Sequence, residues 1–276
     1  MANIAKTGQG KPRIALMGEF SAGKSTLSNL LLGVRSLPEQ VTATRLAPVW
    51  MSYGNAAPFR VDLSGAVTPV SLTGLGDVPL ADTRMIRLFL ECDILKRCDL
   101  IDFPGISDPN MPAEVWERLL PEVDAVIWCT HATQAWRQSE AAVWDTIPDA
   151  IRRFSVLLIT RYDKLINDKD RRRVLQRIGR ETDGQFAAIF PVSLVQALQA
   201  GPDPDKFNAS GAGPFVRHLN TMIEMLAQFT ARNARPPDNI ADNTAINALL
   251  RAPITPRRMR RADADDDQDG PMRVLS

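Results

Sequence analysis

The sequence has little cysteine and histidine and no long hydrophobic run. Its 276 residues include 3 cysteines and 2 histidines. The cysteines show no metal-binding spacing, so we expect buried, reduced thiols at Cys92, Cys98 and Cys129. No apolar stretch approaches the roughly 18 residues of a membrane span, and the first residues lack the hydrophobic block of a secretory signal. These absences predict a cytoplasmic protein that touches a membrane peripherally at most.

An excess of charge of one sign is also missing. Lysine and arginine together number 33 and aspartate and glutamate 32, which gives a formal net charge of +1. This balance argues against an extended nucleic-acid surface. The C-terminal tail shows the same balance of charge, because a cluster of arginines at 257–261 is followed at once by a run of aspartates at 263–269. Within a Debye length of about 8 Å the two fields cancel, so we expect a disordered tail without nucleic-acid partners.

What the sequence does contain is a phosphate-binding loop. Residues 18–25 match GxxxxGK[ST] and lie between an apolar run at 13–17 and leucines at helical spacing that end at Gly33. In this context of strand, loop and helix, Lys24 adds positive charge at the β and γ phosphates and the Ser25 hydroxyl binds Mg²⁺. We expect the nucleotide to contact Gly18, Glu19, Phe20, Ser21, Ala22, Gly23, Lys24, Ser25 and Thr26.

Three later segments follow in the order of a guanine-nucleotide domain. In the first, Asp102 follows an apolar strand and would hold Mg²⁺ through a water, while the Gly105 N–H reaches the γ-phosphate.

The other two segments would recognise the base. Thr160, Arg161 and Asp163 follow another apolar strand, and the Asp163 carboxylate can accept hydrogen bonds from guanine N1–H and N2–H₂. Adenine lacks both donors, so a buried Asp163 would discriminate roughly 10⁴-fold. Residues 191–194, with Ser193 among the expected nucleotide-binding residues, fit the last base-contacting loop, where a backbone N–H would meet guanine O6.

Together these segments resemble the GTPase domain of dynamin-like proteins, particularly the bacterial ones. The resemblance covers roughly the first 230 residues and rests on GEFSAGKSTLSNLLLG at 18–33, VTATRLAP at 41–48, LIDFPGISDP at 100–109, TRYD at 160–163 and PVSL at 191–194. It implies an α/β P-loop GTPase domain with a mostly parallel central sheet flanked by helices. It also implies Mg²⁺-dependent GTP hydrolysis and a transient homodimer of GTPase heads, or pairing with a second dynamin-like protein, often at a membrane.

The resemblance assigns a threonine of the first switch to Mg²⁺ and the γ-phosphate. Aligned on the family pattern this residue is Thr44, with Thr42 as the alternative. Arg45 follows directly, either as a charge stabiliser or as a solvated arginine.

Activation of the attacking water departs from Ras-like GTPases, because Ile106 stands where they carry a glutamine. Dynamin-like proteins lack that glutamine too. Eukaryotic members use a polar residue at the position of Phe20 and a serine at that of Ser21, which helps position K⁺ or Na⁺. Phe20 cannot orient water, whereas Ser21 remains a catalytic candidate beside Lys24 and Thr44. We therefore expect slow intrinsic turnover that a second head or partner raises.

Alternating patterns predict a doubly wound sheet within a GTPase domain at 1–232, followed at 233–276 by a linker, a short helix near 240–250 and the tail. We expect a hairpin of strands 47–53 and 59–63, strands at 85–91, 95–102, 125–129, 155–160 and 188–192, and helices near 113–120, 138–146 and 169–180. Apolar residues from Phe215 to Phe229 form one stripe on a final helix, which either packs in the core or docks a partner helix. The remaining length leaves no room for the family's stalk, so a stalk-bearing partner or a stand-alone switch is expected.

Three functions are compatible with these observations. The first is an active dynamin-like GTPase, and the second is a nucleotide-gated binding switch with negligible hydrolysis, which Ile106 and Phe20 favour. The third, a ribosome-assembly type GTPase, is disfavoured by the near-zero net charge and the absence of an appended RNA-binding domain.

Overall fold

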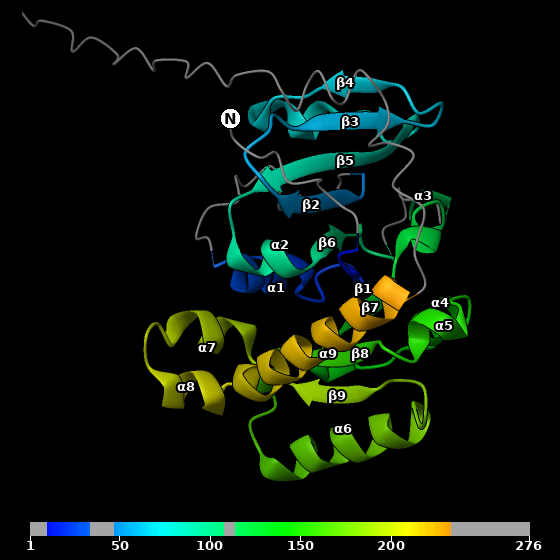
Figure 1. The fold of residues 1–276 in the computed structure, drawn as a ribbon. Coiled ribbons are helices and arrows are strands. Elements are labelled where there is room, and N and C mark those ends of the chain that lie inside the picture. The colour runs from blue at the N-terminus through cyan, green and yellow to red at the C-terminus, as the bar shows by residue number, and fades with distance from the viewer. Residues whose placement is uncertain (1–9, 34–46, 108–113, 233–276) are drawn as a thin grey trace, which may run out of the picture.

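A computed structural model of the chain describes residues 10–33, 47–107 and 114–232. These residues build one sheet of nine strands in the order β4-β3-β5-β2-β6-β1-β7-β8-β9 (Figure 1). Half of the sheet is parallel and comprises β1 (Arg13–Gly18), β6 (Asp99–Asp102), β7 (Ala125–His131), β8 (Val156–Thr160) and β9 (Ala188–Pro191). The expected α/β fold with a mostly parallel central sheet is therefore confirmed.

In the remaining part of the sheet the expected hairpin of strands 47–53 and 59–63 is wrong. It comprises β2 (Val49–Tyr53), β3 (Phe59–Asp62), β4 (Val67–Pro69) and β5 (Thr83–Leu90). β2 and β3 do not pair, because β5 lies between them, parallel to β2 and antiparallel to β3. Residues at both faces of β5 are buried, so this strand gains most from an interior position. The connection at 54–58 is long enough to pass over the roughly 10 Å between strands two places apart.

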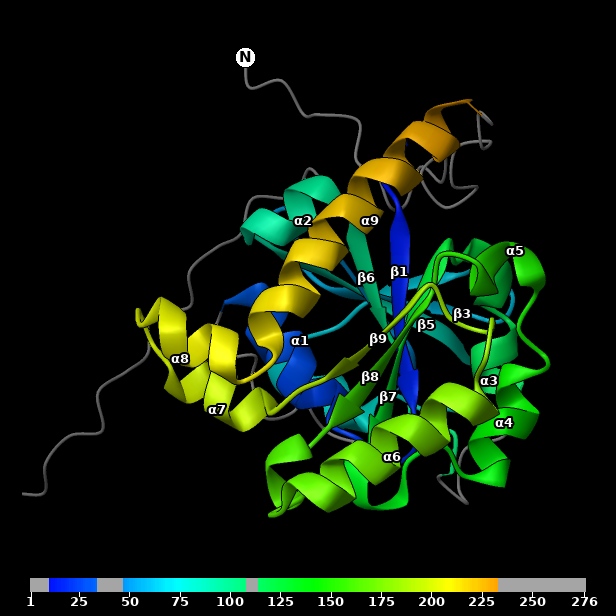
Figure 2. The same cartoon turned by 90° about the horizontal axis from the view of Figure 1, so that it is seen from below.

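Helices cover both faces of the sheet and make a three-layer molecule (Figure 2). One face packs against α1 (Lys24–Leu32), α2 (Asp93–Arg97), α7 (Leu194–Gln199) and α9 (Ala212–Arg232). The other packs against α3 (Glu114–Glu117), α4 (Gln138–Trp144), α5 (Asp149–Arg152) and α6 (Asp168–Glu181). Alternation along β1 sets this division, since Ile14 and Leu16 belong to the first core and Ala15 and Met17 to the second.

Short elements complete the described chain. They are α8 (Pro204–Ala209), which packs against α7 and α9, and the 3₁₀ turns η1 (Leu72–Asp77), η2 (Leu120–Glu122), η3 (Ala132–Gln134) and η4 (Tyr162–Lys164). The strand expected over 95–102 begins only at Asp99. The preceding residues form α2, whose Asp93 and Lys96 pair at 2.7 Å and suit the two ends of the helix dipole.

Most apolar side chains singled out in the sequence serve packing. Phe215, Leu219, Met222 and Leu226 of α9 are buried in the first core, whereas Phe229 is 41% exposed. The cysteines form no disulfide with one another; Cys98 and Cys129 are buried as expected, whereas Cys92 is only half-buried. Across the described ranges no helix combines the length and apolarity needed to cross a bilayer. The expected linker, helix and tail at 233–276 lie outside the described residues.

Candidate functional site

The loop between β1 and α1 is shaped for an anion. A Cβ added at Gly18 would lie 2.1 Å from the Cys129 carbonyl oxygen, so only glycine lets the loop leave the sheet here. The Ala22 N–H then donates to the Glu19 carbonyl at 3.2 Å, and Ser21 takes the left-handed backbone conformation at φ 58°. The N-cap of α1 is Gly23, which offers no capping side chain, and the first residues of the helix line the cavity in front of the loop, where a helix start favours an anion.

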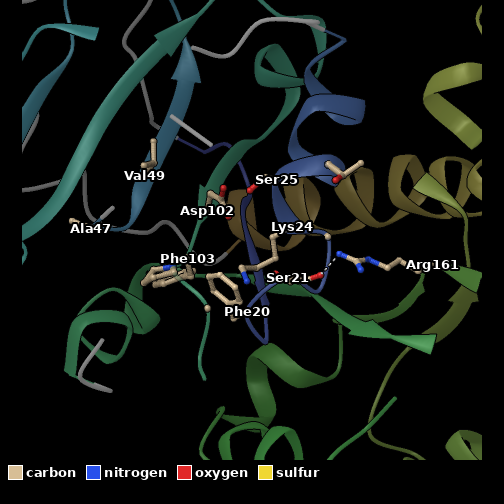
Figure 3. Close-up of a pocket in the computed structure, with 13 residues that line it drawn as sticks. Phe20, Ser21, Lys24, Ser25, Ala47, Val49, Asp102, Phe103 and Arg161 are labelled. Carbon is tan, nitrogen blue, oxygen red and sulfur yellow. Dashed lines mark hydrogen bonds between the residues drawn. The ribbon is translucent and has the colours of Figure 1, made fainter. Parts of the chain in front are cut away.

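Lys24 begins α1 and bends back over this loop (Figure 3). Its ammonium donates to the carbonyl oxygens of Gly18 at 3.1 Å and Glu19 at 2.8 Å. Burial lowers the pKa of Lys24, and the nearby Asp102 carboxylate opposes that shift. A cation is thereby held at the mouth of the loop, where phosphate oxygens would compensate its desolvation.

Asp102 ends β6 and lines the same cavity as Lys24. Its Oδ1 is buried and has no hydrogen-bond partner within the described ranges. Burial raises the pKa of Asp102 to about 6, and the Lys24 charge opposes the rise. An unpartnered buried carboxylate oxygen is costly unless a cation or donor meets it.

Ser25 lies beside Asp102 in the lining of this cavity (Figure 3). A hydroxyl and a carboxylate are hard oxygen ligands of the kind Mg²⁺ takes alongside phosphate oxygens and water. The donor set therefore fits the expected Mg²⁺. The third expected ligand, Thr44, and its alternative Thr42 lie outside the described residues.

The segment after Asp102 is fastened to the phosphate loop. A Cβ at Gly105 would lie 2.9 Å from both the Cα and the N of Phe20, so the two backbones touch here. The Ile106 N–H donates to the Gly18 carbonyl at 3.2 Å, and the Phe20 N–H donates to the Ser107 hydroxyl at 3.0 Å. No role of its own was predicted for Ser107 from the sequence, although it belongs to the LIDFPGISDP segment on which the resemblance rests.

A second cavity of about 260 Å³ adjoins the first at the carboxyl end of β8. Asp163, which the sequence assigned to base recognition, lies in its wall on η4, and the other lining residues are Gly23, Thr26, Thr160, Arg161, Lys164, Leu194 and Val195. Gly23, Thr26 and Arg161 line both cavities, which makes them two parts of one cleft. A base and a phosphate chain can thus occupy neighbouring compartments.

Ser193, in the segment expected to contact the base, makes its own hydrogen bonds within the protein. Its N–H donates to the Ser210 carbonyl at 2.8 Å, so this amide is not directed at a base. Ser193 is the N-cap of α7, and its hydroxyl accepts from the Gln196 N–H. Leu194 and Val195, the first residues of α7, line the cavity.

Thr160 and Arg161 reach the phosphate loop in addition to lining the base cavity. The Thr160 hydroxyl lies 2.7 Å from the Ala22 carbonyl oxygen, and the Arg161 guanidinium donates to the Ser21 carbonyl at 3.1 Å. Their role in this geometry is to hold the loop from the side of the base.

A further set of contacts around Glu19 was not predicted from the sequence. Its carboxylate accepts hydrogen bonds from Arg137 and Ser139, which precede and begin α4. No local motif marks either residue, and they lie 118 and 120 positions away in the chain. Trp136, which precedes Arg137, is packed in the core with 6% of its surface exposed.

Comparisons with known proteins relate the chain to large GTPases. No protein-family profile matches it. The chain is 25% identical over 219 residues to dynamin-like protein 2 of Campylobacter jejuni, covering 76% of this chain and 35% of that protein. It is 23% identical over 229 residues to a chloroplastic protein of Arabidopsis thaliana named as an FZO-like transmembrane GTPase, covering 78% and 24%. The chain thus spans about a third or less of the curated relatives it matches.

A structural comparison agrees on the fold. The chain superposes on an oligomerised bacterial dynamin pair with a TM-score of 0.54 and 19% identity, covering 81% of this chain and 37% of the other. That structure is described as a mechanism for the long-range sensing and tethering of membranes. At 19% sequence identity this structural similarity supports a shared fold only.

Proposed function

We propose that this chain, whose described residues form a dynamin-like GTPase domain, binds GTP and GDP and hydrolyses GTP to GDP and phosphate. One observation carries the proposal. Lys24 is held at the loop mouth by two backbone carbonyls, and Asp102, whose Oδ1 is buried without a partner among the described residues, lines the same cavity. A buried cation and a buried carboxylate facing one cleft suit a phosphate chain with its metal.

The chain's own residues divide the work between binding and stabilisation. Ser25, Asp102 and Thr44 would hold Mg²⁺, which when bound neutralises charge on the β and γ phosphates. Lys24 contacts the same phosphates, and the loop N–H groups with that of Gly105 surround their oxygens. Since the tight contact of Gly105 with Phe20 fixes this segment, its N–H is positioned before nucleotide binds.

Base selection follows from Asp163. The residue is half-buried in the wall of the second cavity, where its carboxylate would receive N1–H and N2–H₂ of guanine. With adenine it would face no donor at either position, which leaves a partly desolvated charge unpaired.

Rapid hydrolysis would need help from outside this chain. Ile106 packs against the second core and has no polar group to orient water, and Phe20 is apolar and 49% exposed beside the loop. A monovalent cation near Ser21, a second copy of the domain, or a second dynamin-like protein would supply the missing stabilisation. We propose that this chain acts in membrane remodelling and reaches the membrane peripherally, through such a partner. We also propose that its GTPase domain ends near residue 232.

The same two side chains favour one alternative. A nucleotide-gated switch with negligible hydrolysis would keep Lys24, Asp102 and Asp163 for binding while Ile106 and Phe20 leave water unactivated. Multiple-turnover phosphate release, measured with and without K⁺, separates the two functions because a switch gives none under either condition.

Nucleotide titrations test the proposal itself. We expect GTP and GDP to bind and ATP to bind orders of magnitude more weakly. Asp163→Asn replaces one acceptor by a donor and should shift the preference towards xanthine nucleotides, whose 2-oxo group can receive it. Lys24→Ala is the matched control for catalysis and should abolish phosphate release. Equal affinity of the wild-type protein for ATP and GTP would overturn the assignment of the base site.

A further inference from the structure

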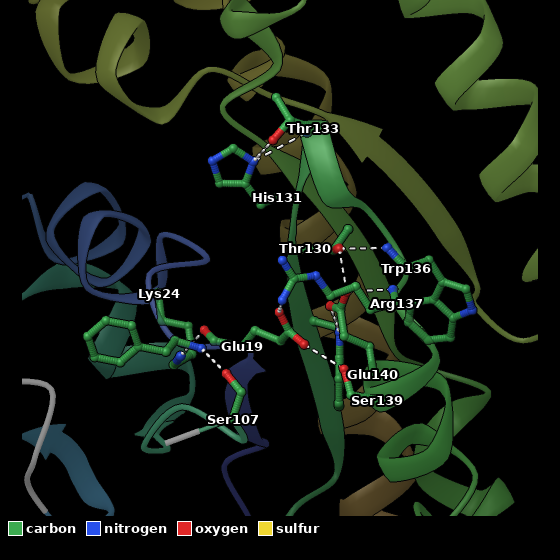
Figure 4. Close-up of polar contacts among 12 residues, drawn as sticks. Glu19, Lys24, Ser107, Thr130, His131, Thr133, Trp136, Arg137, Ser139 and Glu140 are labelled. Carbon is green, nitrogen blue, oxygen red and sulfur yellow. Dashed lines mark hydrogen bonds and ion pairs between the residues drawn. The ribbon is translucent and has the colours of Figure 1, made fainter. Parts of the chain in front are cut away.

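The side chain of Glu19 is tied to a distant part of the chain (Figure 4). Its Oε2 accepts from the Arg137 guanidinium at 3.0 Å, and its Oε1 accepts from the Ser139 hydroxyl at 2.6 Å. The Glu19 side chain is only 13% exposed, whereas that of Arg137 is 45% exposed. Both carboxylate oxygens of a phosphate-loop residue are therefore satisfied by the segment that leads into α4.

The main chain of the same residue organises the loop. The Glu19 carbonyl accepts from the Lys24 ammonium at 2.8 Å and from the Ala22 N–H at 3.2 Å. Any rotation of Glu19 would move this carbonyl and with it the resting position of Lys24. Tethering the Glu19 side chain restricts this backbone rotation and so helps to hold the Lys24 ammonium, which also rests on the Gly18 carbonyl.

The segment that carries Arg137 is held in a strained turn. Trp136 has φ 57°, a left-handed conformation that is strained for a bulky residue. Its N–H donates to the Thr130 hydroxyl at 2.9 Å. Its ring packs on Trp128, Trp144 and Phe186, with centroids 6.1, 6.3 and 5.3 Å away. Backbone strain kept at one residue needs such support, and here its effect is to direct the next residue to the phosphate loop.

A buried carboxylate completes the support. Glu140 is 1% exposed and accepts from the Arg137 N–H at 3.0 Å, from Trp128 Nε1 at 2.9 Å and from the Thr130 hydroxyl at 2.9 Å. Because Thr130 also receives the Trp136 N–H, both peptide groups of the turn are anchored. Arg137 and Ser139 therefore face Glu19 before any nucleotide arrives.

We propose that Arg137 and Ser139 are positioning residues for the nucleotide site, which act through Glu19 to preset the phosphate loop and the Lys24 ammonium. This role rests on the proposed function, since it concerns the same cleft. Neither residue touches the cavity that would hold the phosphates, so their effect is on the geometry of residues that do. The clamp, defined as Glu19, Arg137 and Ser139, reduces the ordering that nucleotide binding otherwise requires.

Titration of the full chain with GDP tests the clamp. Arg137→Met keeps the length of the side chain and removes its donors, and we expect GDP and GTP affinity to fall together by about 5- to 20-fold. Ser139→Ala should lower both by a smaller factor, and Arg137→Lys, which keeps one charged donor, should restore most of the affinity. Arg97→Met is a matched control, because Arg97 makes a comparable 3.1 Å tertiary ion pair with Glu224 at the opposite end of the sheet. It should leave affinity unchanged.

A double-mutant cycle distinguishes positioning from general stability. If the clamp acts through Lys24, Arg137→Met should change GDP affinity less than about twofold when Lys24→Ala is already present. An equal loss in both backgrounds overturns the proposed route. Wild-type affinity in Arg137→Met overturns the clamp alone, whereas a wild-type chain that binds no guanine nucleotide removes the proposed function and the clamp with it. Should Arg137→Met fail to fold, the same cycle with Ser139→Ala decides.

Discussion

The Thr160 hydroxyl lies 2.7 Å from the carbonyl oxygen of Ala22, 138 residues earlier in the chain. The strand that presents the base-site residues therefore also supports the phosphate loop from beneath. A methyl carbon of Thr160 faces Gly23 as well, at 3.6 Å from the position a Cβ would take there. We therefore expect a movement at the proposed base site to shift the loop that is proposed to bind the phosphates.

Thr160→Val should weaken this support without changing the size of the side chain. The buried Ala22 carbonyl loses its partner, which costs about 1–3 kcal/mol of stability, and affinity for GDP should fall several-fold. Urea unfolding and GDP titration measure the two effects, and Thr160→Ser, which keeps the hydroxyl, is the control. Wild-type behaviour of the valine variant would show that this hydrogen bond contributes nothing.

Gly105→Ala should disturb the site through a backbone contact. The new Cβ would lie 2.9 Å from the Cα and N of Phe20, so one of the two segments must move. We expect a loss of about 1–3 kcal/mol in stability, together with weaker GTP binding. Gly179→Ala in α6 is the control, since nothing lies within 4 Å of its Cβ and the change should stabilise the helix by about 0.5–1 kcal/mol. Equal unfolding curves for Gly105→Ala and wild type would contradict the contact.

Asp102 should make the metal-free protein less stable as pH rises. Its pKa in the fold is about 6 against a usual 3.8, so the folded state binds its proton more tightly than the unfolded state. The resulting stability is present at pH below about 4 and is lost as pH rises through about 6, by at most about 3 kcal/mol and less where solvent screens the carboxylate. Urea unfolding of wild type and Asp102→Asn in EDTA, compared across this window, measures the difference. A pH slope equal in both proteins would refute it.

Turnover should depend on association. Loss of a water-positioning or charge-stabilising group costs on the order of 10³ to 10⁵ in rate, so the isolated chain should be slow. Specific activity should rise with protein concentration or with a stalk-bearing partner, and a transition-state mimic of GTP should increase the mass in solution. Light scattering and phosphate release measure both. Rapid turnover by a monomer at every nucleotide state is the result that would exclude this mechanism.

The sequence by itself determined the parts of the site that lie within single segments. The loop at 18–25, Asp102 after its strand and Asp163 after another all follow from strand-to-loop patterns and local chemistry. The structure brings them to one cleft because carboxyl ends of parallel strands share one edge of a sheet. The α/β class follows in the same way from alternating periodicities.

Only the tertiary structure decided which distant groups meet. Strand partners depend on burial against surfaces that lie far away in the sequence. For this reason β5 lies between β2 and β3, although the local sequence pattern favoured a hairpin of those two strands. The Ser193 N–H donates to the Ser210 carbonyl, and the Glu19 carboxylate accepts from Arg137 and Ser139. Neither contact could be predicted, because hydrogen-bond partners across a fold leave no local pattern at either position in the sequence. Local pattern encodes periodicity and turn chemistry, whereas the choice of partner is made when buried polar groups must all be satisfied at once.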